Sequence, residues 1–336
     1  MHSVFPHLPL FSSTLILGTI MALSSNQWIY VWMGLEINLL SFIPLIISQS
    51  NNQETEAAIK YFLAQATGSG LLLLGSMNYF FHPMMFSGQK SSCIFILIGL
   101  MIKLGMAPCH FWFPSVMSSL SWPMCLILTT WQKLVPLLIL IFLLNSMIHQ
   151  LSLIPAALSS IVGGLGGLNQ TQLRPLLAYS SIGHMGWMFA ASLISSATST
   201  MYFSIYIMII APIMLIMKMM SKKSPKEFSS LSKTPMSSVF MLMLAILSLG
   251  GLPPLTGFFP KWITMEALMN NNQWMLTSVL VLGSLMNLSY YLNIFFSMSI
   301  KSYSYYQFIN SKSWFSMLMM TLLATCTLPL VMVMNL

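Results

Sequence analysis

The sequence predicts an all-α protein that crosses a lipid bilayer many times, and its composition and length both support this fold class. Of its 336 residues, 57% are hydrophobic and only 5% are charged, whereas soluble domains carry about 25% charged residues. Five acidic and 13 basic residues are too few to cover a water-facing surface. Since a spanning helix needs about 20 apolar residues, the chain has room for roughly eleven helices and no large domain outside the membrane.

Apolar runs separated by polar segments predict eleven helices in a single transmembrane domain over residues 1–336. The expected bounds are 6–24, 26–47, 56–80, 92–118, 122–144, 150–168, 175–194, 198–220, 236–268, 273–299 and 313–335. Polar segments at 49–53, 82–90, 221–235 and 301–313 mark the clearest connections. The N-terminal segment has neither Lys nor Arg and no small-residue cleavage site, so we expect its first apolar run to remain in the mature protein.

Positive charges in the loops predict the orientation, because loops on the inner side of a membrane are enriched in Lys and Arg. Loops after odd-numbered helices hold only Lys90, whereas loops after even-numbered helices hold nine basic residues. These are Lys60, Arg174, Lys218, Lys222, Lys223, Lys226, Lys233, Lys301 and Lys312. The asymmetry places the N-terminus on the inner side and, with eleven helices, the C-terminus on the opposite side.

Four charged residues lie well inside the apolar runs, away from the ends of these runs. They are Glu36, Lys103, Lys133 and Lys261. Each costs about 2.5–3.5 kcal/mol at the centre of a spanning helix, so such residues are functional by default. Burial favours a neutral lysine and a nearby carboxylate favours a charged one. If neighbouring lysines cannot all be charged at once, the four residues form a proton relay.

Structural interpretations of the same residues stand beside this relay. Glu36 and Lys103 could form an ion pair that only joins two helices. Lys261, near the end of a helical segment, could extend its ammonium group to the membrane surface. His184 and His110 could relay protons, because the ordinary pKa of histidine lies near neutrality. Packing is the favoured interpretation of such histidines, since buried polar side chains are usually hydrogen-bonded.

The fourth and ninth apolar runs are too long and too interrupted to be simple spans. The fourth contains Gly105 and Pro108, and the ninth contains Gly251, Pro253 and Pro254. Proline removes a backbone donor and clashes with the preceding turn, so we expect both helices to break within the membrane. Irregular backbone at that depth is tolerated where it is buried in protein or lines a cavity.

The two expected breaks match one another at a constant offset of 146 residues. Gly105, Pro108, Phe113 and Pro114 correspond to Gly251, Pro254, Phe259 and Pro260. Because the breaks lie five helices apart, the two copies must cross the membrane in opposite directions. This predicts inverted five-helix repeats over 6–144 and 150–299, followed by the helix 313–335. Such repeats with paired discontinuous helices are typical of ion transporters.

Other kinds of chemistry are not indicated. The four cysteines, Cys93, Cys109, Cys125 and Cys326, show no C-x-x-C spacing, which argues against zinc and iron–sulfur sites. No G-x-G-x-x-G motif follows a strand, and no spaced pair of histidines suggests haem. The basic residues are scattered among apolar runs, so no nucleic-acid partner is expected. We expect no metal site and no catalytic residue for redox chemistry in this chain.

Six strings carry a resemblance to a known family. They are MGLEINLLSFIPLI, EAAIKYFLAQA, KLGMAPCHFWFP, TWQKLVPLLIL, GGLNQTQLRPLLAYSSIGHMGW and SLGGLPPLTGFFPKW, within residues 26–268. They resemble the antiporter-like chain 2 family of membrane subunits of mitochondrial NADH:ubiquinone oxidoreductase, respiratory complex I. The resemblance implies an antiporter-like fold of inverted five-helix repeats, with eleven helices in animal members.

The resemblance also implies a role for each buried charge. Glu36 is similar to the family's acidic residue of the first half-channel, and Lys103 to the lysine paired with it. Lys133 resembles the central lysine that links the half-channels, and Lys261 the terminal lysine that faces the second half-channel. The implied function is proton translocation coupled to NADH-to-ubiquinone electron transfer on other subunits, within an H⁺-translocating NADH:ubiquinone reductase.

The expected setting is the mitochondrial inner membrane, with the N-terminus on the matrix side and the C-terminus on the intermembrane-space side. By resemblance, FMN, iron–sulfur clusters and ubiquinone sit on other subunits of a hetero-oligomer. The implied partners are other membrane-arm subunits, in particular chains 4 and 4L, together with membrane lipid. Two alternatives remain, namely a stand-alone cation/proton antiporter and a scaffold subunit whose buried charges only stabilise assembly.

Overall fold

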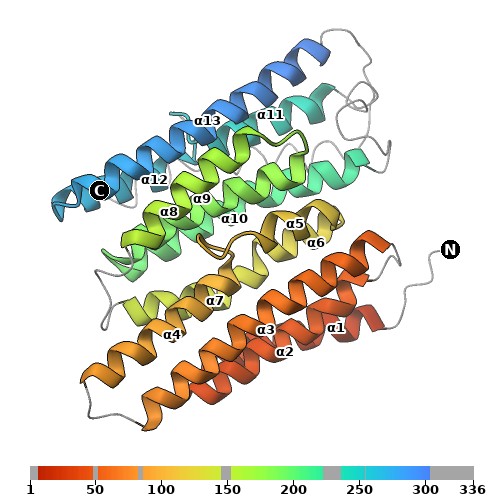
Figure 1. The fold of residues 1–336 in the computed structure, drawn as a ribbon. Helices are drawn as coiled ribbons and strands as arrows, with labels where there is room; N and C mark the ends of the chain where they lie inside the picture. The colour runs from red at the N-terminus through yellow and green to blue at the C-terminus, as the bar shows by residue number, and fades with distance from the viewer. Residues whose placement is uncertain are drawn as a thin grey trace. The chain divides into compact units, whose positions relative to one another are not determined.

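The computed structural model describes residues 7–47, 52–81, 86–144, 153–221, 236–253 and 255–302, and it confirms the all-α fold class in these ranges (Figure 1). These ranges hold thirteen helices and no strand. The helices are α1 (His7–Ser24), α2 (Trp28–Ile46), α3 (Asn52–Phe81), α4 (Phe86–Leu104), α5 (Trp112–Ser119), α6 (Trp122–Thr129), α7 (Trp131–Leu144), α8 (Leu153–Leu168), α9 (Leu173–Ser192), α10 (Ser196–Ser221), α11 (Met236–Gly250), α12 (Phe258–Asn270) and α13 (Trp274–Ser302). The helix expected over 313–335 lies outside the described residues, so the count of eleven spans stays a prediction.

Several of these segments are long and apolar enough to cross a bilayer. In the described part of the chain they are Trp28–Ile46, Asn52–Asn78, Trp122–Leu143, Ser196–Met220 and Trp274–Ser299. Four shorter apolar helices accompany them, at Leu8–Ser24, Ser91–Leu104, Leu153–Leu168 and Val239–Gly250. Together they agree with a chain that passes through the membrane many times.

The chain divides into two compact units, Met1–Pro155 and Ala156–Leu336. In the first unit, α3 packs on α2, α4 and α5, while α7 packs on α4 and α6. In the second unit, α10 packs on α9, α11 and α12, and α13 packs on α9, α11 and α12. In each unit, one long helix therefore contacts both halves of the expected broken helix: α3 contacts α4 and α5, and α10 contacts α11 and α12.

Glycine allows some of these helices to approach one another closely. A Cβ atom on Gly68 of α3 would lie 3.1 Å from the carbonyl oxygen of Gly99 on α4. A Cβ atom on Gly163 of α8 would lie 2.5 Å from the amide nitrogen of Gly183 on α9. In lipid, helix association depends on this kind of close packing, because the surrounding chains are as apolar as the helix surfaces.

Both expected helix breaks are present, and they have the same layout. Helices α4 and α11 each end one residue before a glycine with positive φ, Gly105 at 69° and Gly251 at 81°. This left-handed conformation favours glycine. Helices α5 and α12 each begin seven residues after that glycine. Pro108 and Pro253 lie in the intervening loops, and Pro254 lies outside the described residues.

The backbone hydrogen bonds at the two breaks also repeat with the offset of 146 residues. The N–H of Gly105 donates to the carbonyl oxygen of Ile102 at 3.1 Å, and the N–H of Gly251 donates to that of Ser248 at 3.0 Å. Equivalent local structure at equivalent positions is what an internal repeat produces. The inverted relation between the copies stays a prediction.

A third break divides the helix expected over 122–144 into α6 and α7. Thr130, between them, has φ of −112° and ψ of −70°. The hydroxyl of Thr129 donates to the carbonyl oxygen of Cys125 at 2.9 Å, and the hydroxyl of Thr130 donates to that of Leu126 at 2.7 Å. Hydroxyl groups that bond to the preceding turn bend helices. The segment expected over 122–144 is therefore helical with one interruption at Thr130, and from Trp122 to Leu143 it is still long and apolar enough to cross a bilayer.

Candidate functional site

The three lysines of the predicted relay are buried, and each lies beside a helix interruption. Lys103, Lys133 and Lys261 are 5%, 2% and 6% exposed. Lys103 belongs to the last turn of α4, whereas Lys133 and Lys261 belong to the first turns of α7 and α12. The fourth predicted residue, Glu36, lies half-buried on α2.

Glu36 and Lys103 interact electrostatically without forming an ion pair. The negative charge of Glu36 acts on the ammonium group of Lys103, but no ion pair within 4.0 Å joins these two described residues. The Oε2 atom of Glu36 is buried and has no hydrogen-bond partner among the described residues. A buried carboxylate oxygen in this state is costly, so it gains from a hydrogen-bond donor. The interpretation as a structural ion pair does not fit this arrangement.

Helix α3 forms the wall beside Lys103. Gly68 leaves room for the lysine stem, because a Cβ atom there would lie 3.2 Å from Lys103 Cγ. Gln65 Nε2 donates to the carbonyl oxygen of Lys103 at 3.2 Å, and Trp112 Nε1 donates to that of Ile102 at 3.0 Å. Gln65 thus satisfies a carbonyl group near the end of α4, where helical partners run out, and Trp112 adds a second donor to a carbonyl group that already accepts from Gly105.

Lys133 lies against the helix that follows the first break. Its Nζ atom is 4.4 Å from the centre of the Phe113 ring on α5. A desolvated cation–π contact of this kind stabilises the charged amine by about 2 kcal/mol. Phe113 also packs on the break itself, since a Cβ atom on Gly105 would lie 3.0 Å from Phe113 Cβ. The first break and Lys133 therefore share one aromatic side chain.

A chain of three neutral side chains, absent from the predicted site, runs through the same region. The Tyr61 hydroxyl donates to Gln132 Oε1 at 3.2 Å, and Gln132 Nε2 donates to Asn38 Oδ1 at 2.9 Å. Asn38 and Tyr61 are 2% and 1% exposed. Asn38 follows Glu36 by two positions and Gln132 directly precedes Lys133. The only sign of this chain in the sequence is that two of its residues, the amides Asn38 and Gln132, lie close to a charged residue.

Lys261 closes the second break instead of reaching the membrane surface. Its Nζ atom donates to the carbonyl oxygen of Gly250, the last residue of α11, at 2.9 Å. Gly251 makes room for this contact, because a Cβ atom there would lie 2.8 Å from Nζ. A cation at a helix C-terminus is favoured by the helix dipole. The interpretation of Lys261 as a surface-directed lysine is therefore wrong.

The two histidines considered as secondary relay groups are buried, and each has a polar neighbour. His184 Nδ1 lies 3.0 Å from the Tyr202 hydroxyl, and its ring centre lies 5.3 Å from that of Tyr206. His110 Nδ1 lies 3.2 Å from the carbonyl oxygen of Pro108 within the first break. These contacts fit the packing interpretation, and a relay role for either histidine stays a prediction.

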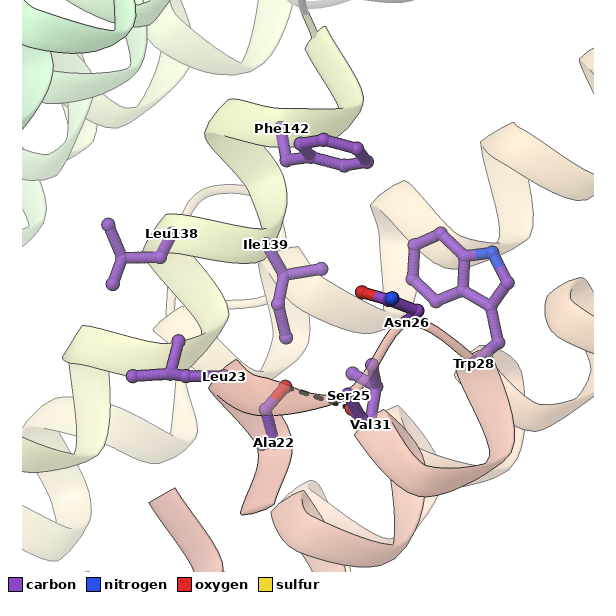
Figure 2. Close-up of a pocket in the computed structure, with 9 residues that line it drawn as sticks. All are labelled: Ala22, Leu23, Ser25, Asn26, Trp28, Val31, Leu138, Ile139 and Phe142. Carbon is purple, nitrogen blue, oxygen red and sulfur yellow. Dashed lines mark hydrogen bonds between the residues drawn. The ribbon is translucent and has the colours of Figure 1, made fainter. Parts of the chain in front are cut away.

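A separate pocket of about 340 Å³ lies in the first unit, beside the turn between α1 and α2. Figure 2 shows Leu138, Ile139 and Phe142 of α7 on one side of it and the turn residues Ser25 and Asn26 near the other. None of the relay charges lines this pocket. The pocket and the relay charges of the first unit, Glu36, Lys103 and Lys133, are thus distinct features.

Metal ligation finds no support in the described part of the chain. No group of three or more His, Cys, Asp or Glu side chains is placed there to hold an ion. Cys93, Cys109 and Cys125 are free thiols, and Cys326 lies outside the described residues. The polar groups described at the site are amines, amides, hydroxyls and a carboxylate.

Comparisons with known proteins match most of the chain. Residues 25–287 match a family model described as NADH:quinone oxidoreductase/Mrp antiporter, TM. The NADH-ubiquinone oxidoreductase chain 2 of Lumbricus terrestris is 47% identical over 293 residues, which cover 87% of this chain and 87% of that protein.

Two solved structures share the fold. Respiratory complex I from Thermus thermophilus with bound aureothin contains a chain that matches with a TM-score of 0.79 and 23% identity, over 98% of this chain and 81% of that one. The Mrp complex from Dietzia sp. DQ12-45-1b contains a chain that matches with a TM-score of 0.77 and 17% identity, over 88% of this chain and 60% of that one. At these identities the likeness is one of fold.

Proposed function

Because the chain belongs to the family of NADH:quinone oxidoreductase and Mrp antiporter membrane proteins, we propose that Glu36 and the three buried lysines are its proton-carrying groups. The protein is an antiporter-like, proton-pumping membrane subunit of complex I, and thus part of an NADH-ubiquinone oxidoreductase. It is a multi-pass protein of the mitochondrial inner membrane and works within a hetero-oligomeric complex.

The observation that carries the proposal is that each buried lysine has its own source of stabilisation for a positive charge. For Lys103 it is the charge of a carboxylate, for Lys133 the face of an aromatic ring, and for Lys261 a carbonyl oxygen at a helix end. A buried amine binds a proton while such a contact is present and releases it when the contact is weakened. Three different contacts allow the three amines to be loaded and emptied separately.

In the first unit, the carboxylate can control the neighbouring amine. An ionised Glu36 favours the protonated form of Lys103. When Glu36 takes up a proton, on an oxygen such as the buried Oε2, that support is lost and Lys103 favours release of its own proton. Alternating protonation of this kind is the elementary step that the proposal assigns to the pair.

The remaining parts of the proposal concern the setting of the subunit. FMN, iron–sulfur clusters and ubiquinone belong to other subunits, and chains 4 and 4L and membrane lipid contact this one. Exposed apolar side chains such as Leu17 and Ile20 on α1 support contacts of this type. The loop charges support an N-terminus on the matrix side, a C-terminus on the intermembrane-space side, and a single domain of inverted repeats over 6–144 and 150–299.

The variant Lys133→Ala tests the proposal in the assembled enzyme. It removes the buried ammonium group and its contact with Phe113 without touching the glycines of the breaks. We expect fewer protons moved per electron or, if coupling is strict, slower electron transfer together with slower pumping. Lys60→Ala, at an exposed lysine, is the control. Normal electron transfer with an unchanged proton-to-electron ratio in Lys133→Ala would show that the assigned role is wrong.

Purification separates this role from that of a stand-alone cation/proton antiporter. The chain is expected to co-purify with a large membrane complex that oxidises NADH. Cation/proton exchange by the isolated chain in liposomes would contradict the proposal and favour the antiporter. Together with the lysine variant, this measurement also separates pumping from a purely structural role.

A further inference from the structure

Helix α3 carries none of the four proposed proton-carrying groups, yet one of its faces contacts segments that hold two of them. Gln65 and Gly68 contact Lys103. Tyr61, one turn earlier on α3, donates to Gln132, which directly precedes the buried lysine of α7. Residues at this spacing lie on one face of a helix. The segments that carry Lys103 and Lys133 therefore both contact the same face of α3.

The hydrogen-bonded chain through Gln132 has two self-consistent directions. In the observed one, the Tyr61 hydroxyl donates to Gln132 Oε1 and Gln132 Nε2 donates to Asn38 Oδ1. If both amides turn, Asn38 donates to Gln132 and Gln132 donates to the Tyr61 oxygen. Turning only one amide would place two acceptors or two donors opposite each other. The three groups must therefore reverse together.

Reversal frees the Tyr61 hydroxyl hydrogen for another acceptor, and the carboxylate of Glu36 is the candidate. The charge of Glu36 acts on Tyr61, and its buried Oε2 atom has no donor among the described residues. An ionised Glu36 favours the direction in which Tyr61 donates toward it, directly or through a water molecule. A protonated Glu36 favours the observed direction. The charge of Glu36 thus selects between the two arrangements.

The same reversal changes the surroundings of Lys133. Gln132 and Lys133 are neighbours in the first turn of α7, directly after the break at Thr130. Turning the Gln132 amide reverses a dipole beside the buried amine. Because an amide binds protons too weakly to carry them, the chain transmits orientation and not a proton.

We propose that Tyr61, Gln132 and Asn38 are positioning residues that couple the charge of Glu36 to Lys133 through a hydrogen-bonded chain with two directions. The proposal rests on the proposed function, since it requires that Glu36 and Lys133 each bind and release a proton during turnover. Its new content is the assignment of a neutral link between them, centred on the buried face of α3.

A double-mutant cycle tests the link in the assembled enzyme reconstituted into liposomes. Tyr61→Phe, Gln132→Leu and the double variant are compared for protons moved per electron. Each single variant is expected to lower the ratio, and the double variant to lower it no further than the more severe single one, because both remove the same chain. Tyr30→Phe, at a tyrosine that is 49% exposed, is the control for loss of a hydroxyl group.

The variant Gln132→Glu gives a signature that a purely structural role would not produce. A neutral glutamic acid can accept from Tyr61 and donate to Asn38, whereas the ionised form only accepts. Pumping by this variant is expected to approach that of the unmodified enzyme at low pH and to fall further below it as pH rises. The titratable groups around it, which are Glu36, Tyr61, Lys103 and Lys133, are present in both enzymes, so the difference between the two pH profiles reports the new carboxyl group.

The outcomes separate the two proposals. If Lys133→Ala pumps normally, both the proposed function and the proposed link are wrong. If Lys133→Ala impairs pumping but the Tyr61 and Gln132 variants behave like Tyr30→Phe, the link alone is overturned. Additive effects in the double variant, or a Gln132→Glu profile parallel to that of the unmodified enzyme, would overturn it as well.

Discussion

At the scale of single residues, the contact between Lys261 and α11 depends on the absence of a side chain at Gly251. The backbone there has φ of 81°, and a Cβ atom would lie 2.8 Å from the lysine Nζ. The preceding residue, Gly250, has a different environment. A Cβ atom on Gly250 would meet Tyr291 and Leu288 at 3.5 and 4.0 Å, which are ordinary contact distances. Two adjacent glycines therefore offer a matched pair for substitution.

We expect Gly251→Ala to impair the protein and Gly250→Ala to be tolerated. The left-handed backbone at Gly251 costs an alanine about 1–2 kcal/mol, and the new methyl group displaces the ammonium of Lys261. At Gly250, the last residue of α11, the new methyl group makes only ordinary contacts. The measurements are thermal inactivation of the assembled enzyme and protons moved per electron. Equal behaviour of the two variants would contradict the positioning of Lys261 by Gly251.

Charged residues of the site could be predicted from the sequence, whereas its hydrogen-bonding residues could not. A charged residue in an apolar run is conspicuous by itself, which is why Glu36 and the three lysines could be named from the sequence. Tyr61 and Gln132 are ordinary residues for a membrane protein, and they become a pair only when α3 packs near α7. The partner of Lys261 is a backbone carbonyl, a group that every residue carries and no sequence pattern marks.

At the scale of helices, the break between α6 and α7 is expected to depend on two hydroxyl groups. In a double variant Thr129→Ala and Thr130→Ala, nothing competes for the carbonyl groups of the preceding turn, so α6 and α7 should join. Because each helical residue turns by about 100°, this change rotates Lys133 relative to Phe113 and should lower the proton-to-electron ratio. A structure of the assembled variant checks the geometry.

Thr200→Ala provides the control for that variant. Thr200 is exposed on α10, and its hydroxyl also donates to its own helix, at the carbonyl oxygen of Ala197. Loss of this hydroxyl should leave both structure and pumping unchanged. A break that persists at residue 130 after both threonines are replaced would show that its cause lies elsewhere.

The breaks also show which local signals can be interpreted from sequence. Glycine and proline remove a side chain or a backbone donor in any surroundings, so the breaks after α4 and α11 could be predicted. Threonine and serine hydroxyls bond to the preceding turn in many regular helices of this chain, such as at Thr19 and Ser41. The same chemistry at Thr129 and Thr130 accompanies a break, so hydroxyl groups alone do not distinguish the two cases.

Helix α8 depends on close packing along its glycines. A methyl group at Gly163 would lie 2.5 Å from the backbone nitrogen of Gly183 on α9. The backbone cannot move aside as a flexible side chain can. Gly163→Ala is expected to destabilise the second unit by about 1–3 kcal/mol and to reduce the amount of assembled complex on a native gel. Gly70→Ala, where a Cβ atom would meet nothing within 4 Å, should assemble normally.

At the scale of the whole molecule, the loop charges predict which side of the membrane each connection faces. A tag inserted at Ser224, after the eighth expected helix, should lie on the matrix side, and a tag at Leu336 on the intermembrane-space side. Accessibility of each tag to a membrane-impermeant reagent in mitochondria without an outer membrane measures this. Both tags on one side would show that the number of spans between them is not odd.

Hydropathy indicates which helices can cross a membrane, but it does not indicate which helices contact one another. The motif shared by the two breaks identified equivalent positions 146 residues apart, and the backbone there is equivalent. Apolar residues face lipid and neighbouring helices alike in a membrane, so the sequence does not tell which helix faces are covered. For this reason the wall that α3 provides for Lys103 could not be foreseen.

The burial of helix α9 affects how the protein is inserted into the membrane. All of its residues except Arg174 and Tyr179 are buried, and it packs against α8, α10, α12 and α13. It is also not among the described helices whose length and composition alone suffice to cross a membrane. A segment of this kind gains little from entering lipid by itself, so it depends on partners such as α10 and α13 that are synthesised after it. We therefore expect the second unit to enter the bilayer as a group of helices instead of one helix at a time.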